Sequence, residues 1–114
     1  MTEPRQHRDL FPGALEMMIL KTLRRGPLHG YALAQQIIAA SDDMLRVEEG
    51  SLYPALQRML KVGWVDAKWG VSSTNRRVRL YTLTTAGRRH LEHELSRLEQ
   101  MVNGITRVLA LARS

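Results

Sequence analysis

Residues 48–65 read EEGSLYPALQRMLKVGWV, and their pattern indicates which class of fold to expect. Its apolar side chains recur every three or four positions, which is the spacing of one face of an α-helix. Ser51 is the expected N-cap, and it would place Pro54 in the first turn, where a missing N–H costs little. The pattern runs to Gly63 and changes beyond it. The stretch therefore predicts a helix whose buried face is formed by Leu52, Leu56, Met59 and Leu60.

The opposite face of this predicted helix is polar and basic. The recognition helix of a helix-turn-helix protein must pack one side on the core while its outward residues reach phosphates and base edges. A cation suits phosphate or guanine, an amide suits adenine, and hydroxyls suit backbone oxygens. A basic helix alone is weak support, because such faces are often simply solvated. The candidate DNA-binding residues of this helix are Ser51, Tyr53, Pro54, Gln57, Arg58 and Lys61.

Two further helices are predicted upstream. Residues 14–25 carry apolar side chains at helical spacing, and Gly26-Pro27 then ends the helix. Residues 29–41, HGYALAQQIIAAS, show the same spacing. At the start of this second helix, Tyr31 offers a phenol to a phosphate, which the helix dipole would favour. Tyr31 is equally compatible with a core position that leaves its hydroxyl at the surface.

Downstream of the quoted stretch, β-branched and aromatic residues alternate with polar ones. Residues 64–69 and 78–83 are predicted to form antiparallel strands, joined by the turn-rich loop 70–77. The order of three helices, strand, basic loop and strand is that of a winged helix-turn-helix. We expect an α+β, mostly α, fold with a flexible leader over residues 1–9 and a DNA-binding domain over residues 10–83. The candidate DNA contacts of the wing are Asn75, Arg76, Arg77 and Arg79, with Lys68 nearby.

Residues 84–114 are predicted to form one long helix with Thr84 as its N-cap. Its apolar residues are spaced alternately by four and three positions, which is a heptad seam typical of helices that pair. A seam of this length exceeds what so small a core needs, so we expect it to form a homodimer. The alternative is a long helix packed on its own domain. The predicted dimerisation residues are Leu91, Leu95, Leu98, Val102, Ile105 and Leu109.

The positive charge of the chain is concentrated in one region. The 114 residues include 17 Lys or Arg and 11 Asp or Glu, which gives a net charge of +6. Residues 50–79 alone hold six of the basic residues and one of the acidic residues. A local excess of this kind favours a polyanionic partner, because each neutralised phosphate releases counterions. Together with the predicted fold, it indicates double-stranded DNA as the partner.

Other classes of function have little support. The chain has no cysteine, which excludes disulfides and thiolate metal sites, and its apolar runs are too short to cross a bilayer. We expect a cytoplasmic protein with no membrane contact, no enzymatic activity and no cofactor, since no catalytic motif is present. His90 and His93 stand one turn apart, a spacing that metal ligands use. Both lie off the seam, where solvated residues are expected, so we expect no metal site. Trp64 and Trp69 fall on opposite faces of the first strand, and neither needs a ligand.

Three strings of the sequence together resemble the PadR family of bacterial transcriptional regulators. They are PLHGYAL at residues 27–33, EEGSLYPALQRMLKVGWV at 48–65 and NRRVRLYTLTTAG at 75–87, and their joint order is more specific than any one of them. The resemblance covers residues 10–91. It implies a dimeric repressor whose winged helix-turn-helix binds a palindromic operator and whose C-terminal helical part dimerises. By motif, it implies DNA-facing positions at Tyr31, Ser51, Tyr53, Pro54, Asn75, Arg76 and Arg77.

The chain resembles the short form of the family, with one C-terminal helix in place of a separate helical domain. Some short members bind flat aromatic drugs between two subunits through a tryptophan on that helix, but this sequence has no tryptophan after Trp69. A small apolar effector at the dimer interface remains an alternative. Met17, Met18 and Met101 would line such a cavity, although core packing is their more direct explanation. A further alternative is a winged helix that binds an acidic protein through its basic face.

Overall fold

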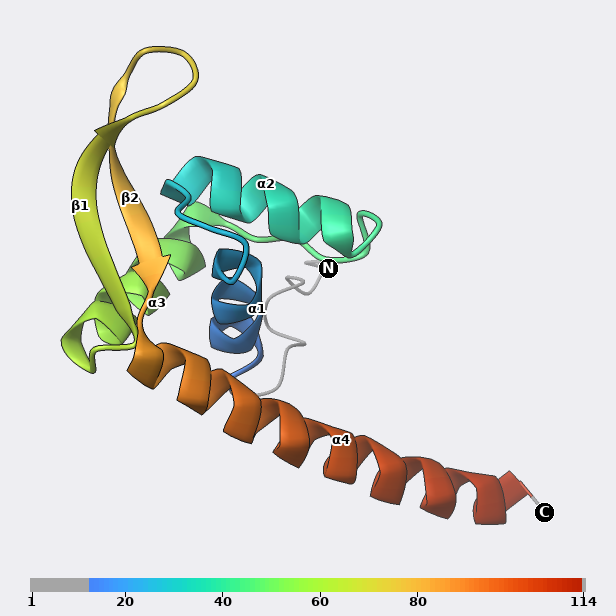
Figure 1. Cartoon of the computed structure of the whole chain (residues 1–114). Helices are drawn as coiled ribbons and strands as arrows, with labels where there is room; N and C mark the ends of the chain where they lie inside the picture. The colour runs from blue at the N-terminus through green and yellow to red at the C-terminus, as the bar shows by residue number, and fades with distance from the viewer. Residues whose placement is uncertain (1–12, 114) are drawn as a thin grey trace.

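The computed structural model describes residues 13–113, so the leader expected at residues 1–9 lies outside the described residues. Within residues 13–113, three helices precede a β-hairpin and a long fourth helix follows it (Figure 1). The predicted fold class is confirmed. The elements are α1 (Ala14–Leu23), α2 (Gly30–Ala40), α3 (Glu49–Lys61), β1 (Val65–Val71), β2 (Arg77–Leu83) and α4 (Thr85–Arg113).

The core lies where α1, α2 and α3 meet one another and the base of the hairpin. Each helix turns inward the face on which its apolar residues recur, so Ile19, Leu33 and Leu56 have no exposed surface. Burying one such side chain completely stabilises the fold by about 1.5–3 kcal/mol. No polar or charged side chain of the described residues is buried. Apart from the phenol of Tyr81, the core of the described residues is therefore apolar.

Helix α3 begins earlier than the sequence led us to expect. Glu48 is its N-cap, and the Glu48 carbonyl accepts the N–H groups of Ser51 and Leu52 at 3.0 and 2.9 Å. The prediction that Ser51 caps the helix is therefore wrong, because Ser51 already belongs to the first turn. Pro54 consequently lies inside the helix, one turn further along than predicted. Its missing N–H removes the helical hydrogen bond that would reach the Gly50 carbonyl.

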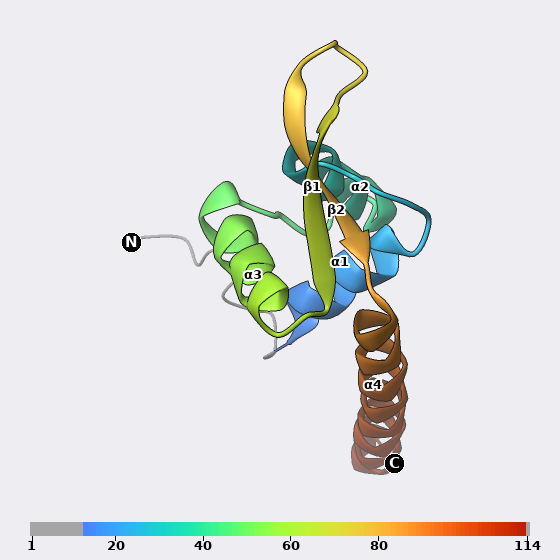
Figure 2. The ribbon, with the colours of Figure 1, turned by 60° about the vertical axis from the view of Figure 1, so that its left-hand side comes forward.

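The hairpin has the predicted position and a tight turn. β1 and β2 pair antiparallel, with Val65 opposite Leu83 and Val71 opposite Arg77. In the turn, the Asn75 N–H donates to the Ser72 carbonyl at 3.0 Å, and Asn75 has a φ of 63°. Asparagine adopts this left-handed conformation more readily than most residues. The turn holds the hairpin as a narrow arm that projects beyond the helices (Figure 2).

A single β-bridge joins the segment before α2 to the hairpin. The Leu28 N–H donates to the Tyr81 carbonyl at 3.2 Å, and the Tyr81 N–H donates to the Leu28 carbonyl at 2.9 Å. Because α2 begins two residues after Leu28, this bridge fixes the start of α2 beside β2. Sequence periodicity contained no sign of it.

Helix α4 is capped as predicted and is anchored to the hairpin at its start. The Gly87 N–H donates to the Thr84 hydroxyl oxygen at 3.0 Å, which is an N-cap interaction. The Thr84 hydroxyl itself donates to the Gly63 carbonyl at 2.6 Å, just before β1. One threonine thus connects the end of α3, the end of β2 and the first turn of α4.

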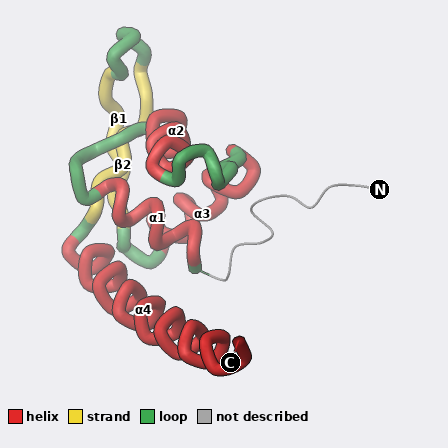
Figure 3. The backbone as a smooth tube through the Cα atoms, turned by 90° about the vertical axis from the view of Figure 1, so that its right-hand side faces the viewer, coloured by secondary structure: helices red, strands yellow, loops and turns green. Residues whose placement is uncertain are grey.

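The heptad seam of α4 divides into two parts. Leu91 is completely buried in the core, and Leu95 and Leu98 are partly buried against it. Beyond them the helix runs away from the other elements (Figure 3). Ile105, in this outer part, keeps 51% of its surface exposed, and Val102, Val108, Leu109 and Leu111 are likewise exposed. The alternative that α4 packs on its own domain therefore describes its first part only.

Candidate nucleic-acid interface

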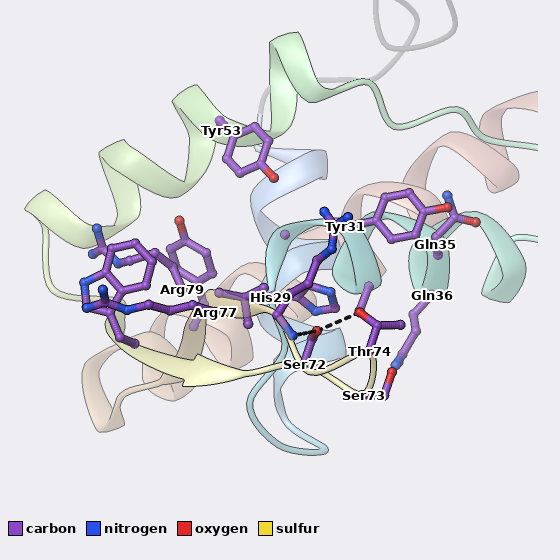
Figure 4. A pocket seen from close by; sticks show the side chains of 16 residues that line it. His29, Tyr31, Gln35, Gln36, Tyr53, Ser72, Ser73, Thr74, Arg77 and Arg79 are labelled. Atoms are coloured by element: carbon purple, nitrogen blue, oxygen red, sulfur yellow. Dashed lines mark hydrogen bonds between the residues drawn. The ribbon is translucent and has the colours of Figure 1, made fainter.

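A groove of about 970 Å³ lies between the start of α2, helix α3 and the hairpin (Figure 4). Tyr31 and Tyr53 contribute from the two helices, and Arg76, Arg77 and Arg79 contribute from the hairpin. The described residues that line it include no Asp or Glu. The groove therefore collects five predicted site residues from three separate segments, and its charge is positive.

The close approach of α3 to α2 depends on a glycine. A Cβ atom built on Gly30 would lie 2.6 Å from the Tyr53 hydroxyl oxygen and under 3.0 Å from two ring carbons. A side chain at this position would therefore force the Tyr53 ring to shift. Burial raises the pKa of Tyr53 above its ordinary value, and the Glu49 carboxylate and Tyr81 act in the same direction. The Tyr53 hydroxyl can donate a hydrogen bond into the groove.

Trp69 also belongs to this site, which was not expected from the sequence. Its indole lines the groove and is 56% exposed. The Arg77 Cζ lies 4.5 Å from the ring centroid and the Arg79 Cζ lies 5.7 Å from it. Strand parity could have found this residue, because Trp69 pairs across the hairpin with Arg79 and must share its face.

Asn75 lies at the tip of the hairpin, and its left-handed backbone gives it a role in the turn. Around it, the Ser72 hydroxyl oxygen accepts the Arg76 N–H at 3.2 Å and lies 3.0 Å from the Thr74 hydroxyl oxygen. These contacts order the wing without a ligand. Whether Asn75 also contacts DNA stays a prediction.

The remaining predicted residues lie on α3 outside the groove. Gln57, Lys61 and Pro54 are exposed on the face turned away from the core, and Ser51 is half-buried. Arg58 follows Tyr53 by five residues, so it points about 140° away from Tyr53 around the helix axis. There its guanidinium Nη2 pairs with Glu16 Oε2 of α1 at 2.8 Å. This ion pair was not foreseen, because the two residues are 42 positions apart.

Three other side chains weighed in the sequence have ordinary packing roles. The His90 imidazole stacks on the Trp64 indole, with ring centroids 3.6 Å apart. Met17 is buried in the core, and Met18 packs against it. In residues 13–113, no three His, Asp or Glu side chains are arranged to hold a metal ion. No helix in the same range is both long enough and apolar enough to cross a membrane.

Three helices, a basic hairpin and the groove between them define a winged helix-turn-helix protein. The chain belongs to the PadR-like family of transcriptional regulators, whose family model matches residues 19–93. Members of this family are regulators of transcription and not enzymes. The resemblance noted in the sequence is therefore confirmed.

Individual relatives agree with this assignment. The negative transcriptional regulator PadR of Bacillus subtilis is 26% identical over 83 residues, which are 73% of this chain and 46% of that protein. The crystal structure of a PadR-like regulator of Bacillus cereus has a TM-score of 0.74 at 27% identity, over 85% of this chain and 92% of that one. B. subtilis PadR in complex with operator DNA has a TM-score of 0.63 at 26% identity, over 71% of this chain and 47% of that one. The chain thus matches less than half the length of B. subtilis PadR.

Proposed function

We propose that this chain is a homodimeric repressor that binds a palindromic operator through α3, the hairpin and the start of α2. Residues 10–83 form the DNA-binding domain, and residues 84–114 form the dimerisation helix. In the dimer the two α3 helices enter successive major grooves, roughly 34 Å apart. The protein acts in the cytoplasm, on operator DNA.

The observation that carries the proposal is the groove. In the proposed complex a phosphodiester backbone lies in this groove, which Tyr31 and Tyr53 line from the helices and three arginines line from the hairpin. The first residues of α2 also line it, and no side chain caps that helix end. Such an end favours an anion. With the backbone seated there, Gln57 and Lys61 on the outward face of α3 reach the base edges and phosphates of the major groove.

The outer part of α4 supports the homodimer. Val102, Ile105 and Leu109 continue the heptad seam but stay exposed in the single chain. In aqueous solution, an exposed apolar seam with heptad spacing is usually buried by a second helix that has the same spacing. A second copy of the chain supplies such a helix.

Binding is tested by fluorescence anisotropy with duplex fragments of the protein's own promoter region and with random duplex of equal length. We expect tighter binding to one promoter fragment, and an affinity that falls steeply as salt rises. Equal affinity for both duplexes, with no salt dependence, would overturn the proposal. It would favour an acidic protein as the partner of the basic face.

A double variant of the hairpin gives a sharper test. Arg76→Gln with Arg77→Gln should lower the slope of log affinity against log salt by about 0.9 for each phosphate that the variant no longer neutralises. The matched control is Arg88→Gln with Arg89→Gln, which removes the same charge from an exposed pair on α4 that does not line the groove. The control should keep most of the affinity. Equal reductions of affinity in the two double variants would show that only net charge matters.

A regulator that senses a small apolar effector is the second candidate. An apolar groove of about 490 Å³ runs along α4, and Met101, Ile105 and Val108 line it. In the dimer this groove faces the partner helix, where it could enclose a flat apolar molecule. A crystal structure of the dimer would decide, since tight packing of the two α4 helices along Ile105 leaves no such space.

A further inference from the structure

The side chain of Trp69 does not belong to the hydrophobic core. It lies in the outer half of β1, where it lines the groove between the hairpin and the helices, and 56% of its surface is exposed. The core of the described residues contains neither Trp69 nor its strand neighbour Val71. Because this large aromatic side chain lines the groove instead of the core, a role in binding is a direct explanation of its position.

The register of the hairpin puts two arginines on the face of this indole. Trp69 pairs directly with Arg79, and Arg77 lies two residues along the same strand, on the same face. The Cζ atoms lie 4.5 Å (Arg77) and 5.7 Å (Arg79) from the ring centroid. Both distances are within the roughly 6 Å range of a cation–π contact. One ring therefore holds two guanidinium groups that would otherwise repel each other.

The stacked arrangement leaves both arginines free to bind an anion. A guanidinium that lies on a ring keeps its N–H groups directed outward in its own plane. Within residues 13–113, neither Arg77 nor Arg79 forms an ion pair with a carboxylate. Both line the groove in which the DNA backbone is proposed to lie (Figure 4). We therefore expect the contact with the ring to order their donor groups before DNA arrives, which would reduce the entropy cost of binding.

We propose that Trp69 is a positioning residue for DNA binding, which orients Arg77 and Arg79 toward the DNA backbone without contacting the DNA itself. This inference rests on the proposed function. Replacing Trp69 leaves the net charge unchanged, so any loss of DNA affinity would come from the orientation of the arginines and not from their charge.

A double-mutant cycle tests the inference, with operator affinity measured at low salt. Trp69→Ala should weaken binding about tenfold, and Trp69→Phe, which keeps a smaller ring, should weaken it less. In the background Arg77→Gln with Arg79→Gln, Trp69→Ala should change the affinity by less than twofold. Val71→Ala is the matched control, since it shortens another exposed apolar side chain of the same strand. It should change the affinity by less than twofold.

Two results would overturn the inference. The first is an equal weakening by Trp69→Ala in both backgrounds, which would mean that the indole contacts DNA directly. The second comes from ¹⁵N relaxation of the Arg77 and Arg79 side-chain Nε–H groups in the free protein, where we expect greater mobility in Trp69→Phe and greater still in Trp69→Ala. Unchanged mobility would refute positioning even if operator binding itself holds. A wild-type protein that binds no operator would instead contradict the proposed function, and the relaxation measurement would still report on the stack.

Discussion

The Trp64 indole and the His90 imidazole are stacked, with their centroids 3.6 Å apart and their planes 12° from parallel. Trp64 immediately precedes β1, and His90 lies in the second turn of α4. The stack therefore joins the base of the hairpin to α4, beside the hydrogen bond from Thr84 to the Gly63 carbonyl. We refer to Gly63, Trp64, Thr84, Gly87 and His90 together as the joint.

Removing the imidazole should loosen the joint. His90→Ala is expected to lower the free energy of unfolding by about 1 kcal/mol, which is typical of a packed aromatic pair. The matched variant His93→Ala removes an exposed imidazole one turn further along and should change it by less than about 0.5 kcal/mol. Urea unfolding at constant protein concentration measures both. Equal effects would mean that the stack contributes nothing to stability.

Gly87 is the most tightly enclosed glycine of the joint. A Cβ atom at this position would overlap the Trp64 carbonyl oxygen, which is part of the backbone and cannot move aside. Gly87→Ala should therefore destabilise the protein by roughly 1–3 kcal/mol, although alanine favours helix. Gly50→Ala, in the first turn of α3, meets no atom within 4 Å and should be neutral or stabilising. Thermal unfolding followed by circular dichroism separates the two, and a stabilised Gly87→Ala protein would contradict the geometry.

The two parts of the α4 seam should respond differently to the same kind of truncation. Leu91→Ala leaves a cavity in the core and should cost roughly 3 kcal/mol of stability. Ile105→Ala should leave the fold of the single chain intact but weaken the dimer at least about tenfold, because each copy buries less apolar surface. Sedimentation equilibrium measures the second effect. A dimer unaffected by Ile105→Ala would exclude the outer seam as the interface.

Arg58 should contribute less to DNA binding than Lys61, although both are basic residues of α3. Glu16 lies 2.8 Å from the Arg58 guanidinium and neutralises much of its charge. Lys61→Gln is expected to reduce the salt slope of operator binding by about 0.9, and Arg58→Gln by clearly less. In a Glu16→Gln background, Arg58→Gln should approach the effect of Lys61→Gln. If Arg58→Gln has the larger effect in the wild-type background, DNA must displace Glu16.

Local patterns in the sequence were sufficient to predict the elements. Helical periodicity predicted α1, α2 and α3. The alternation of β-branched and aromatic residues with polar ones, on both sides of a turn-rich loop, predicted the hairpin. Thr84 was predicted to be the N-cap from its residue type and its place before the helix. This was possible because capping is a local interaction, in which the Thr84 hydroxyl oxygen accepts a hydrogen bond from the N–H of Gly87, three residues further on. The start of α3 was misplaced for the same local reason. Ser51 is a better intrinsic cap than Glu48, but the Glu48 carbonyl accepts the first helical hydrogen bonds.

The features that no local pattern predicts are contacts between distant segments. The bridge between Leu28 and Tyr81 and the ion pair between Glu16 and Arg58 each join residues far apart in the chain. The division of the seam has a similar origin, since a heptad pattern shows that a face is apolar but not what covers it. Leu91 is covered by its own domain, whereas Ile105 is largely exposed in the single chain. The groove itself arises only when these contacts bring α2, α3 and the wing together.

The joint couples the orientation of α4 to the position of α3. The first turns of α4 are fixed to the residues between α3 and β1. In the proposed dimer, a change in the angle at which two α4 helices cross would therefore be transmitted to α3. The distance from Ile105 back to Thr85 is about 30 Å along the helix axis. A change of about 10° in the crossing angle would therefore shift the two DNA-binding domains by roughly 5 Å relative to each other, more than the roughly 3.4 Å between neighbouring base pairs. A molecule that altered the packing around Ile105 only slightly would thus put the two α3 helices out of step with the operator.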